Sequence, residues 1–204
     1  MTEPANLSDQ RKAIHESIGA AIMAWAHVEV QLNLLFIDLC GRGNDAAFSM
    51  WDRIRSFEAK LQSMNDIARR ELLLDQQKSD WKMLYEHILS AYRNRNKVAH
   101  STMLLSADGI FAIEPFFTMT SASNQRLGCA EIDALRVQFS DLDSCLVWLR
   151  LSHDADRTQR PQSSEPEPDL ILRLRTEDAQ KREAQQHRAQ ALRQYRDQNP
   201  SLKI

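Results

Sequence analysis

The feature that most limits what this chain can fold into is a long apolar stripe at helical spacing near its start. Ser8 is a suitable N-cap, and the helix is expected to reach about Cys40. Apolar side chains recur every three or four residues between them: Ile18, Ile22, Trp25, Leu32, Phe36 and Leu39. The 204 residues include only 5 glycines and 6 prolines, which favours more helices over a turn-rich β fold. We therefore expect an all-α protein.

Two further segments before His100 show the same periodicity. One is expected to form a single helix with these residues on its apolar face: Trp51, Ile54, Phe57, Leu61, Met64 and Ala68. The polar stretch 75–79 separates it from a third helix, for which Asp80 is the expected N-cap. The inner face of that third helix carries Trp81, Leu84, Tyr85, Ile88 and Tyr92.

After His100 the period changes. Thr102–Leu105 and Ile110–Thr118 flank an Asp-Gly turn and are predicted to form a β-hairpin. A fourth helix follows, with the stripe Ile132, Leu135, Phe139, Leu142, Leu146 and Leu149. Residues 1–152 are thus expected to form a four-helix bundle with a small hairpin inserted after the third helix. Residues 153–169 are a linker rich in Pro, Ser and Glu, and residues 170–204 a charged tail, helical or disordered.

Composition narrows the function and the compartment. The formal net charge is −2, so binding to nucleic acid must rely on a local group of cations. The 3 cysteines form no C-x-x-C pair, and the other histidines lack ligand-like spacing, so we expect no metal and no other cofactor. The start of the chain shows no targeting signal, and polar residues such as His27 and Glu29 interrupt the most apolar stretch. We expect a cytoplasmic protein that does not span a membrane.

Two charged residues lie on apolar faces. Arg95 follows Ala91 by four residues and Ile88 by seven, which places it on the inner side of the third predicted helix. Glu29 lies on the stripe of the first helix, four residues after Trp25. Because burying an unpaired charge is costly, we hypothesise that Glu29 and Arg95 pair across the helix interface.

The end of the third predicted helix has the clearest chemical character. Asn96 and His100 are four residues apart and are expected on one side of the helix, forming a half-buried patch with Arg95. Arg93 and Lys97 point roughly to the other side, toward water. A guanidinium can bind phosphate oxygens and stabilise the charge of a transition state, while an imidazole can transfer a proton near neutral pH. These residue types suit a phosphodiester.

The run Arg95-Asn96-Lys97-Val98-Ala99-His100 resembles the signature of the HEPN family, in which an arginine is followed by a polar residue and, after a spacing of four to six, by a histidine. Arg93 followed by Asn94 fits the same pattern with the longer spacing, so both registers remain open. We favour Arg95, because it points inward and because Arg-Asn-x-x-Ala-His is a common form in that family. The resemblance covers about residues 8–152 and includes Trp25 and Glu29, a pair found in some members.

The resemblance implies a HEPN-like bundle and a metal-independent endoribonuclease that acts as a homodimer, with both motifs meeting in one composite cleft. Arg95 would hold and polarise the scissile phosphate, His100 would assist attack by the ribose 2′-OH or protonate the leaving oxygen, and Asn96 would orient the motif. Arg93, Lys97 and Glu29 would support this group. RNA would be cut to a 2′,3′-cyclic phosphate and DNA spared. Relatives of this kind often act as toxins or in antiviral defence, which implies an antitoxin or defence-system partner.

A simpler interpretation stands beside this one. Basic residues are favourable at the carboxyl end of any helix, and Glu29 fits a purely structural pair better than a catalytic part. Members of the same family that only dimerise or bind nucleotides share the fold, and a fold does not by itself confer an activity. The alternative is therefore a non-catalytic module that dimerises or binds a nucleotide or partner protein, with the tail as the interaction element.

Overall fold

The computed structural model describes residues 7–41, 45–105, 109–115, 126–158 and 166–198. The described chain is mostly helical, and the expected all-α class is confirmed, with one small two-stranded sheet. The elements are α1 (Leu7–Cys40), α2 (Asp45–Arg53), α3 (Phe57–Glu71), α4 (Asp75–Ala99), β1 (Ser101–Leu105), β2 (Phe111–Pro115), α5 (Cys129–Thr158) and α6 (Asp169–Gln198). They fall into two compact units, Met1–Pro166 and Glu167–Ile204.

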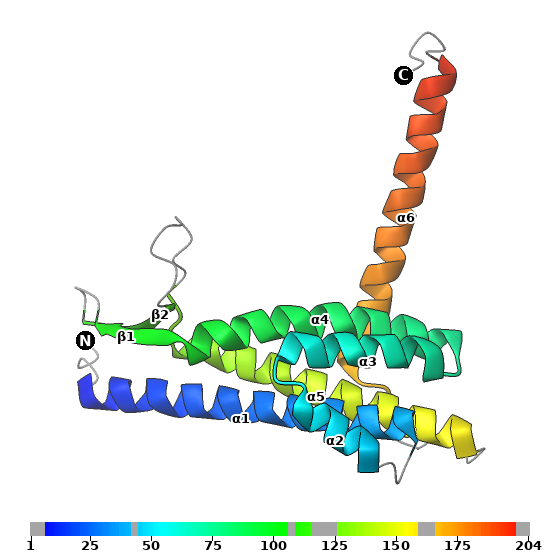
Figure 1. Ribbon diagram of the computed structural model, residues 1–204. Helices are drawn as coiled ribbons and strands as arrows, with labels where there is room; N and C mark the ends of the chain where they lie inside the picture. Colours follow the sequence, from blue (N-terminus) through cyan, green and yellow to red (C-terminus); the bar gives the residue numbers. More distant parts are fainter. Residues whose placement is uncertain (1–6, 42–44, 106–108, 116–125, 159–165, 199–204) are drawn as a thin grey trace. The chain divides into compact units, whose positions relative to one another are not determined.

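The first unit is a helical bundle built around α1. Figure 1 shows α1, α4 and α5 lying lengthwise beside one another, with α2 and α3 against them and the hairpin leading away from the end of α4. The apolar stripe of α1 forms much of the core, with these residues buried: Ile14, Ala21, Trp25, Val28, Leu32, Leu35, Phe36 and Leu39. Of the predicted stripe, Trp25, Leu32, Phe36 and Leu39 are buried, whereas Ile18 and Ile22 are only half-buried.

An aromatic cluster joins four of the helices. The Trp25 ring of α1 lies 5.1 Å from Phe57 of α3, 5.3 Å from Phe139 of α5 and 6.1 Å from Tyr92 of α4, measured between ring centroids. Phe57 and Tyr92 stack on each other at 4.5 Å. Tilted, edge-on and offset aromatic pairs each stabilise beyond the area they bury. The cluster therefore fixes the position of the last two turns of α4 against the rest of the bundle.

The single helix predicted over residues 51–68 is wrong, because residues 54–56 divide it into α2 and α3. Ser56 is the N-cap of α3, and its hydroxyl accepts a hydrogen bond from the backbone N–H of Ala59 at 3.1 Å. A serine in that role starts a new helix, since it satisfies a backbone donor that has no partner within the helix. Trp51 then packs on Phe36 of α1 at 5.1 Å instead of extending the face of α3.

The predicted N-cap at Asp80 is also wrong. α4 begins at Asp75, so Asp80 lies inside the helix, fully buried, and its carboxylate accepts a hydrogen bond from the Gln76 amide at 2.9 Å. Gln77, buried as well, donates to the carboxylate of Asp156 on α5 at 2.7 Å. The polar run that was expected to separate two helices instead supplies the first turns of α4, because its side chains find hydrogen-bonding partners there.

The hairpin after His100 is present. β1 and β2 pair antiparallel, and Gly109 beside the turn has a φ of +78°, which only glycine adopts readily. Ile113 of β2 is buried and forms a β-bridge with Leu127, with N···O distances of 2.9 and 3.0 Å. Asp108 of the expected turn and residues 116–118 of the expected second strand lie outside the described residues.

The fourth predicted helix, α5, is longer than expected. It ends at Thr158, so the expected domain end at residue 152 falls inside a helix, and the first compact unit continues to Pro166. Residues 159–165 of the expected linker lie outside the described residues. In the second unit, α6 spans most of the expected tail as a helix whose ion pairs include Asp178–Arg182 at 2.5 Å.

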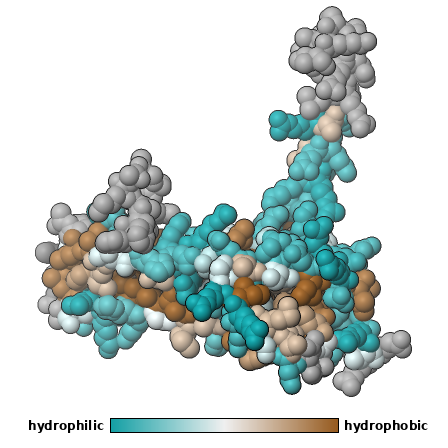
Figure 2. Space-filling view, in the orientation of Figure 1, coloured by the Kyte–Doolittle hydropathy of each residue, from teal (hydrophilic) through white to brown (hydrophobic). Residues whose placement is uncertain are grey.

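By length and composition alone, α1 is apolar enough to cross a membrane. An 18-residue window in it has a mean hydropathy of 1.4, and 33% of that window is buried inside the bundle. Because the core helix of a soluble bundle meets the same criterion, this property does not by itself assign α1 to a membrane. On the face shown in Figure 2, hydrophobic residues reach the surface among hydrophilic ones along the first unit.

Replacing the central ring of the aromatic cluster should destabilise the fold. Trp25→Ala removes a side chain that is 1% exposed and leaves a cavity between four helices, so we expect the free energy of unfolding to fall by about 3–5 kcal/mol. Urea denaturation followed by circular dichroism measures this change. Val137→Ala, at a position on α5 that is 50% exposed, is the control and should change stability by less than about 0.5 kcal/mol. Equal effects of the two substitutions would contradict the role given to Trp25.

Candidate functional site

The end of α4 places His100 at the junction between helix and hairpin. His100 is the C-cap, with φ −114° and ψ 29°, and its backbone N–H donates to the carbonyl oxygen of Asn96 at 3.0 Å. The next residue, Ser101, begins β1, and its hydroxyl donates to the carbonyl oxygen of Lys97. The carbonyl oxygens of Asn96 and Lys97 thus find donors just beyond the helix, which helps to fix where it ends.

The imidazole of His100 is exposed. Within the described residues, no hydrogen bond or ion pair engages its ring nitrogens. The half-buried patch expected at this position is therefore wrong for His100, because its side chain leaves from the very end of the helix. Both ring nitrogens remain accessible to a ligand from solution.

Arg95 is half-buried and is held by its neighbour in sequence. Its Nη1 donates to the side-chain oxygen of Asn96 at 3.2 Å, and Asn96 is half-buried too. The Nε of Arg95 is buried and has no hydrogen-bonding partner among the described residues. Nor does any carboxylate in the described part of the chain pair with this guanidinium.

The pairing expected between Glu29 and Arg95 is wrong. Glu29 instead accepts a hydrogen bond from the indole N–H of Trp25, one turn earlier on α1, at 2.5 Å. The aromatic cluster fixes Trp25, and its buried N–H needs an acceptor, which the carboxylate four residues later supplies without crossing to another helix. Glu29 therefore supports the core tryptophan and does not orient the guanidinium.

Burial distinguishes the two registers of the motif. Arg93 and Lys97 are exposed, as expected, whereas Arg95 is half-buried. The inner face of α4 continues through Val98, which is 4% exposed, and not through Ala99, which is exposed. Arg95 is thus the arginine that the fold holds in place beside Asn96.

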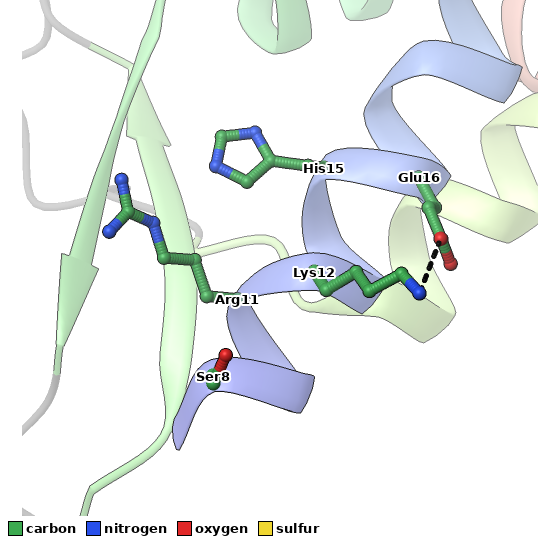
Figure 3. Close-up of a pocket in the computed structure, with 5 residues that line it drawn as sticks. All are labelled: Ser8, Arg11, Lys12, His15 and Glu16. Carbon is green, nitrogen blue, oxygen red and sulfur yellow. Dashed lines mark ion pairs between the residues drawn. The ribbon is translucent and has the colours of Figure 1, made fainter. Parts of the chain in front are cut away.

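A shallow basic hollow on the first turns of α1 was missed by sequence reasoning. It has a volume of about 510 Å³ and is lined by Ser8, Arg11, Lys12, His15 and Glu16. In Figure 3, Arg11 and His15 extend toward the hairpin side of α1, while Lys12 and Glu16 form an ion pair at 3.8 Å. The four-residue spacing of Arg11 and His15 was the available signal, because it puts both on one side of a helix.

A second hollow of about 250 Å³ lies at the opposite end of α1. Its lining residues are Leu39, Cys40, Gly41, Glu71, Leu73, His153 and Arg157. Burial and the nearby Glu71 raise the pKa of Cys40 above 9.0, which keeps the thiol protonated and a poor nucleophile. Burial and Arg157 lower the pKa of His153 below 6.5, only partly offset by neighbouring aspartates. This arrangement is not that of an activated cysteine–histidine pair.

Among the described residues, no group of three His, Cys, Asp or Glu side chains is arranged to hold a metal ion. Compared with known proteins, the chain matches no family model, and no curated protein or solved structure is significantly similar to it. The functional argument therefore rests on the residues at the end of α4.

The buried histidine predicts a pH-dependent stability. The fold keeps His153 neutral, whereas the unfolded chain binds a proton as the pH falls through about 6.5. Because the unfolded state then binds more protons, the free energy of unfolding should be fully present above pH 6.5 and should decline below it. Urea denaturation between about pH 5 and 8, compared with His153→Gln, measures this contribution. His187→Gln, at an exposed position of α6, is the control, and an unchanged pH profile in His153→Gln would contradict the assignment.

Proposed function

We propose that this chain is a metal-independent endoribonuclease of the HEPN type, acting in the cytoplasm as a homodimer. The observation that carries the proposal is the half-buried Arg95, which no carboxylate neutralises within the described residues, at the same helix end as an exposed imidazole. A fixed cation without a counter-ion suits a phosphate, and an accessible imidazole suits proton transfer.

The reaction begins with binding of the scissile phosphate by Arg95, whose Nη1 is already oriented by Asn96. The 2′-oxygen attacks phosphorus, the bond from phosphorus to the 5′-oxygen breaks, and a 2′,3′-cyclic phosphate forms. His100 removes the proton of the 2′-OH or supplies one to the leaving 5′-oxygen, and a water molecule carries out the other proton transfer. Arg95 stabilises the extra negative charge on the phosphorane as it develops. DNA lacks the nucleophile and is not cut.

The basic hollow on α1 supports the same proposal. α1 contacts β2, and β1 begins directly after His100, so the hairpin connects the motif to the part of α1 that carries Arg11 and His15. The chain as a whole carries a net charge of −2. Binding of the RNA phosphates that flank the cut site must therefore rely on a local group of cations such as this one. A toxin or antiviral effector of this type would also bind an antitoxin or another protein of its system.

The alternative is a non-catalytic module of the same fold that binds a partner or nucleotide. One observation favours it: in the described structure the His100 ring has no hydrogen bond that would fix its tautomer and orientation. Catalytic histidines are commonly oriented by a neighbouring acceptor. The two functions differ in whether RNA is cut.

Cleavage in excess chelator is the direct test. The full chain is incubated with a labelled single-stranded RNA and EDTA, and we expect fragments ending in a 2′,3′-cyclic phosphate. His100→Ala should lower the rate by about 10²-fold or more, since it removes proton transfer. His87→Ala, on the same helix and half-buried, is the matched control and should retain the rate. RNA left intact by the wild-type chain would favour the non-catalytic module.

The register of the motif has its own prediction. Arg95→Ala should abolish cleavage, because in the proposed reaction the half-buried guanidinium next to Asn96 binds the scissile phosphate. Arg93→Ala removes an exposed cation two residues away and should weaken RNA binding only slightly. Initial rates at several RNA concentrations separate the two effects. A larger loss in Arg93→Ala than in Arg95→Ala would assign the motif to the longer spacing.

A further inference from the structure

The hollow at the carboxyl end of α1, about 250 Å³ in volume, has no part in the proposed ribonuclease. Three helices form its wall: α1 ends there at Cys40, α3 ends there at Glu71, and α5 supplies His153 and Arg157, one turn apart. A hollow of this volume is smaller than the sites that take drug-sized molecules, so it suits a small metabolite.

His153 is the clearest sign that the hollow takes a ligand. The residue lines the hollow and is only 4% exposed, yet its Nδ1 has no hydrogen-bonding partner. No hydrogen bond within the described chain engages its Nε2 either. Buried polar atoms nearly always have partners, and a neutral imidazole has one donor and one acceptor to satisfy. A ligand in the hollow would satisfy the ring as the chain itself does not.

The side of the hollow that α1 and α3 form is negative. The carboxyl end of a helix carries a partial negative charge, and both helices end here. Glu71 adds a full charge, which together with burial raises the pKa of the nearby Cys40 thiol. In the part of the chain that the structure describes, no cation pairs with Glu71. This side therefore suits an ammonium group.

The side that α5 forms is positive. Arg157 donates from Nη1 to the carbonyl oxygen of Asp38 at 3.3 Å, but no carboxylate among the described residues pairs with its guanidinium. Arg157 and Glu71 both line the hollow and form no ion pair with each other, so the hollow lies between opposite charges. A guanidinium binds both oxygens of a carboxylate, and this side therefore suits a carboxylate.

We propose that this hollow binds a free α-amino acid with an apolar side chain. The ammonium group of the ligand lies against Glu71 and its carboxylate against Arg157, and the ligand completes the hydrogen bonding of His153. An α-amino acid carries both charges within a few bonds of each other, as a hollow of this volume requires. Leu39, which is buried, and Leu73, which is 56% exposed, offer apolar contacts to its side chain.

The amino-acid site goes beyond the ribonuclease proposal and does not depend on it. Gln77 near the start of α4 bonds to Asp156, the neighbour of Arg157, whereas Arg95 follows Gln77 by 18 residues, about 27 Å along the helix. Binding at the hollow is also non-covalent, because the raised pKa of Cys40 keeps its thiol protonated. Either function can therefore fail in experiment without the other.

Calorimetric titration of the full chain with L-leucine tests the proposal. We expect saturable binding of one leucine per chain. Two analogues each lack one charge: 3-methylbutylamine has no carboxylate, and 4-methylpentanoate has no ammonium group. Each analogue should bind about tenfold more weakly or worse, because one charged hydrogen bond is lost. An analogue that binds as tightly as leucine would contradict recognition by two opposite charges.

Substitutions in the hollow locate the binding. Glu71→Gln and Arg157→Gln each remove one charge at an exposed position, so the chain stays folded while leucine affinity falls about tenfold. Glu58→Gln, also exposed on α3 but at its other end, is the matched control and should keep the wild-type affinity. The ring ¹⁵N signals of His153 should shift when leucine is added to the wild-type chain. No binding at millimolar leucine, or wild-type affinity in both hollow variants, would overturn the proposal.

Discussion

The fit of Trp25 among three other aromatic rings is the constraint on which the first unit depends. One side chain of α1 touches α3, α4 and α5 at centroid distances between 5.1 and 6.1 Å, so these helices cannot shift independently of one another. Tyr92 belongs to this cluster and lies three residues before Arg95. The cluster therefore positions the last turns of α4, which carry Arg95 and lead into the hairpin.

The same cluster decides the role of Glu29. A buried indole N–H requires an acceptor, and the carboxylate one turn later on α1 provides it. Arg95 has no carboxylate partner among the described residues, and its Nη1 donates to the side-chain oxygen of Asn96. The carboxylate of Glu29 thus serves the core tryptophan, and the guanidinium near the end of α4 is held by its neighbour in sequence.

α1 contributes both to the core and to the outer surface. Its inner stripe holds the bundle together, whereas Met23, Val30 and Leu34 on the outer side remain exposed. Because α1 carries apolar residues on both its inner and its outer side, its length and composition match those of a membrane span. Only 33% of its most apolar window is buried inside the bundle.

The sequence by itself determined the helical class, much of the inner face of α1 and the hairpin after His100, since these follow from local spacing and turn residues. Only the tertiary structure decided which partners these residues have. The break at Ser56, the burial of Asp80 and the hydrogen bond from Trp25 to Glu29 each depend on side-chain geometry that spacing does not encode. Periodicity fixes the side of a helix on which a residue lies, whereas its partner depends on which donors and acceptors come within hydrogen-bonding distance once the helices pack.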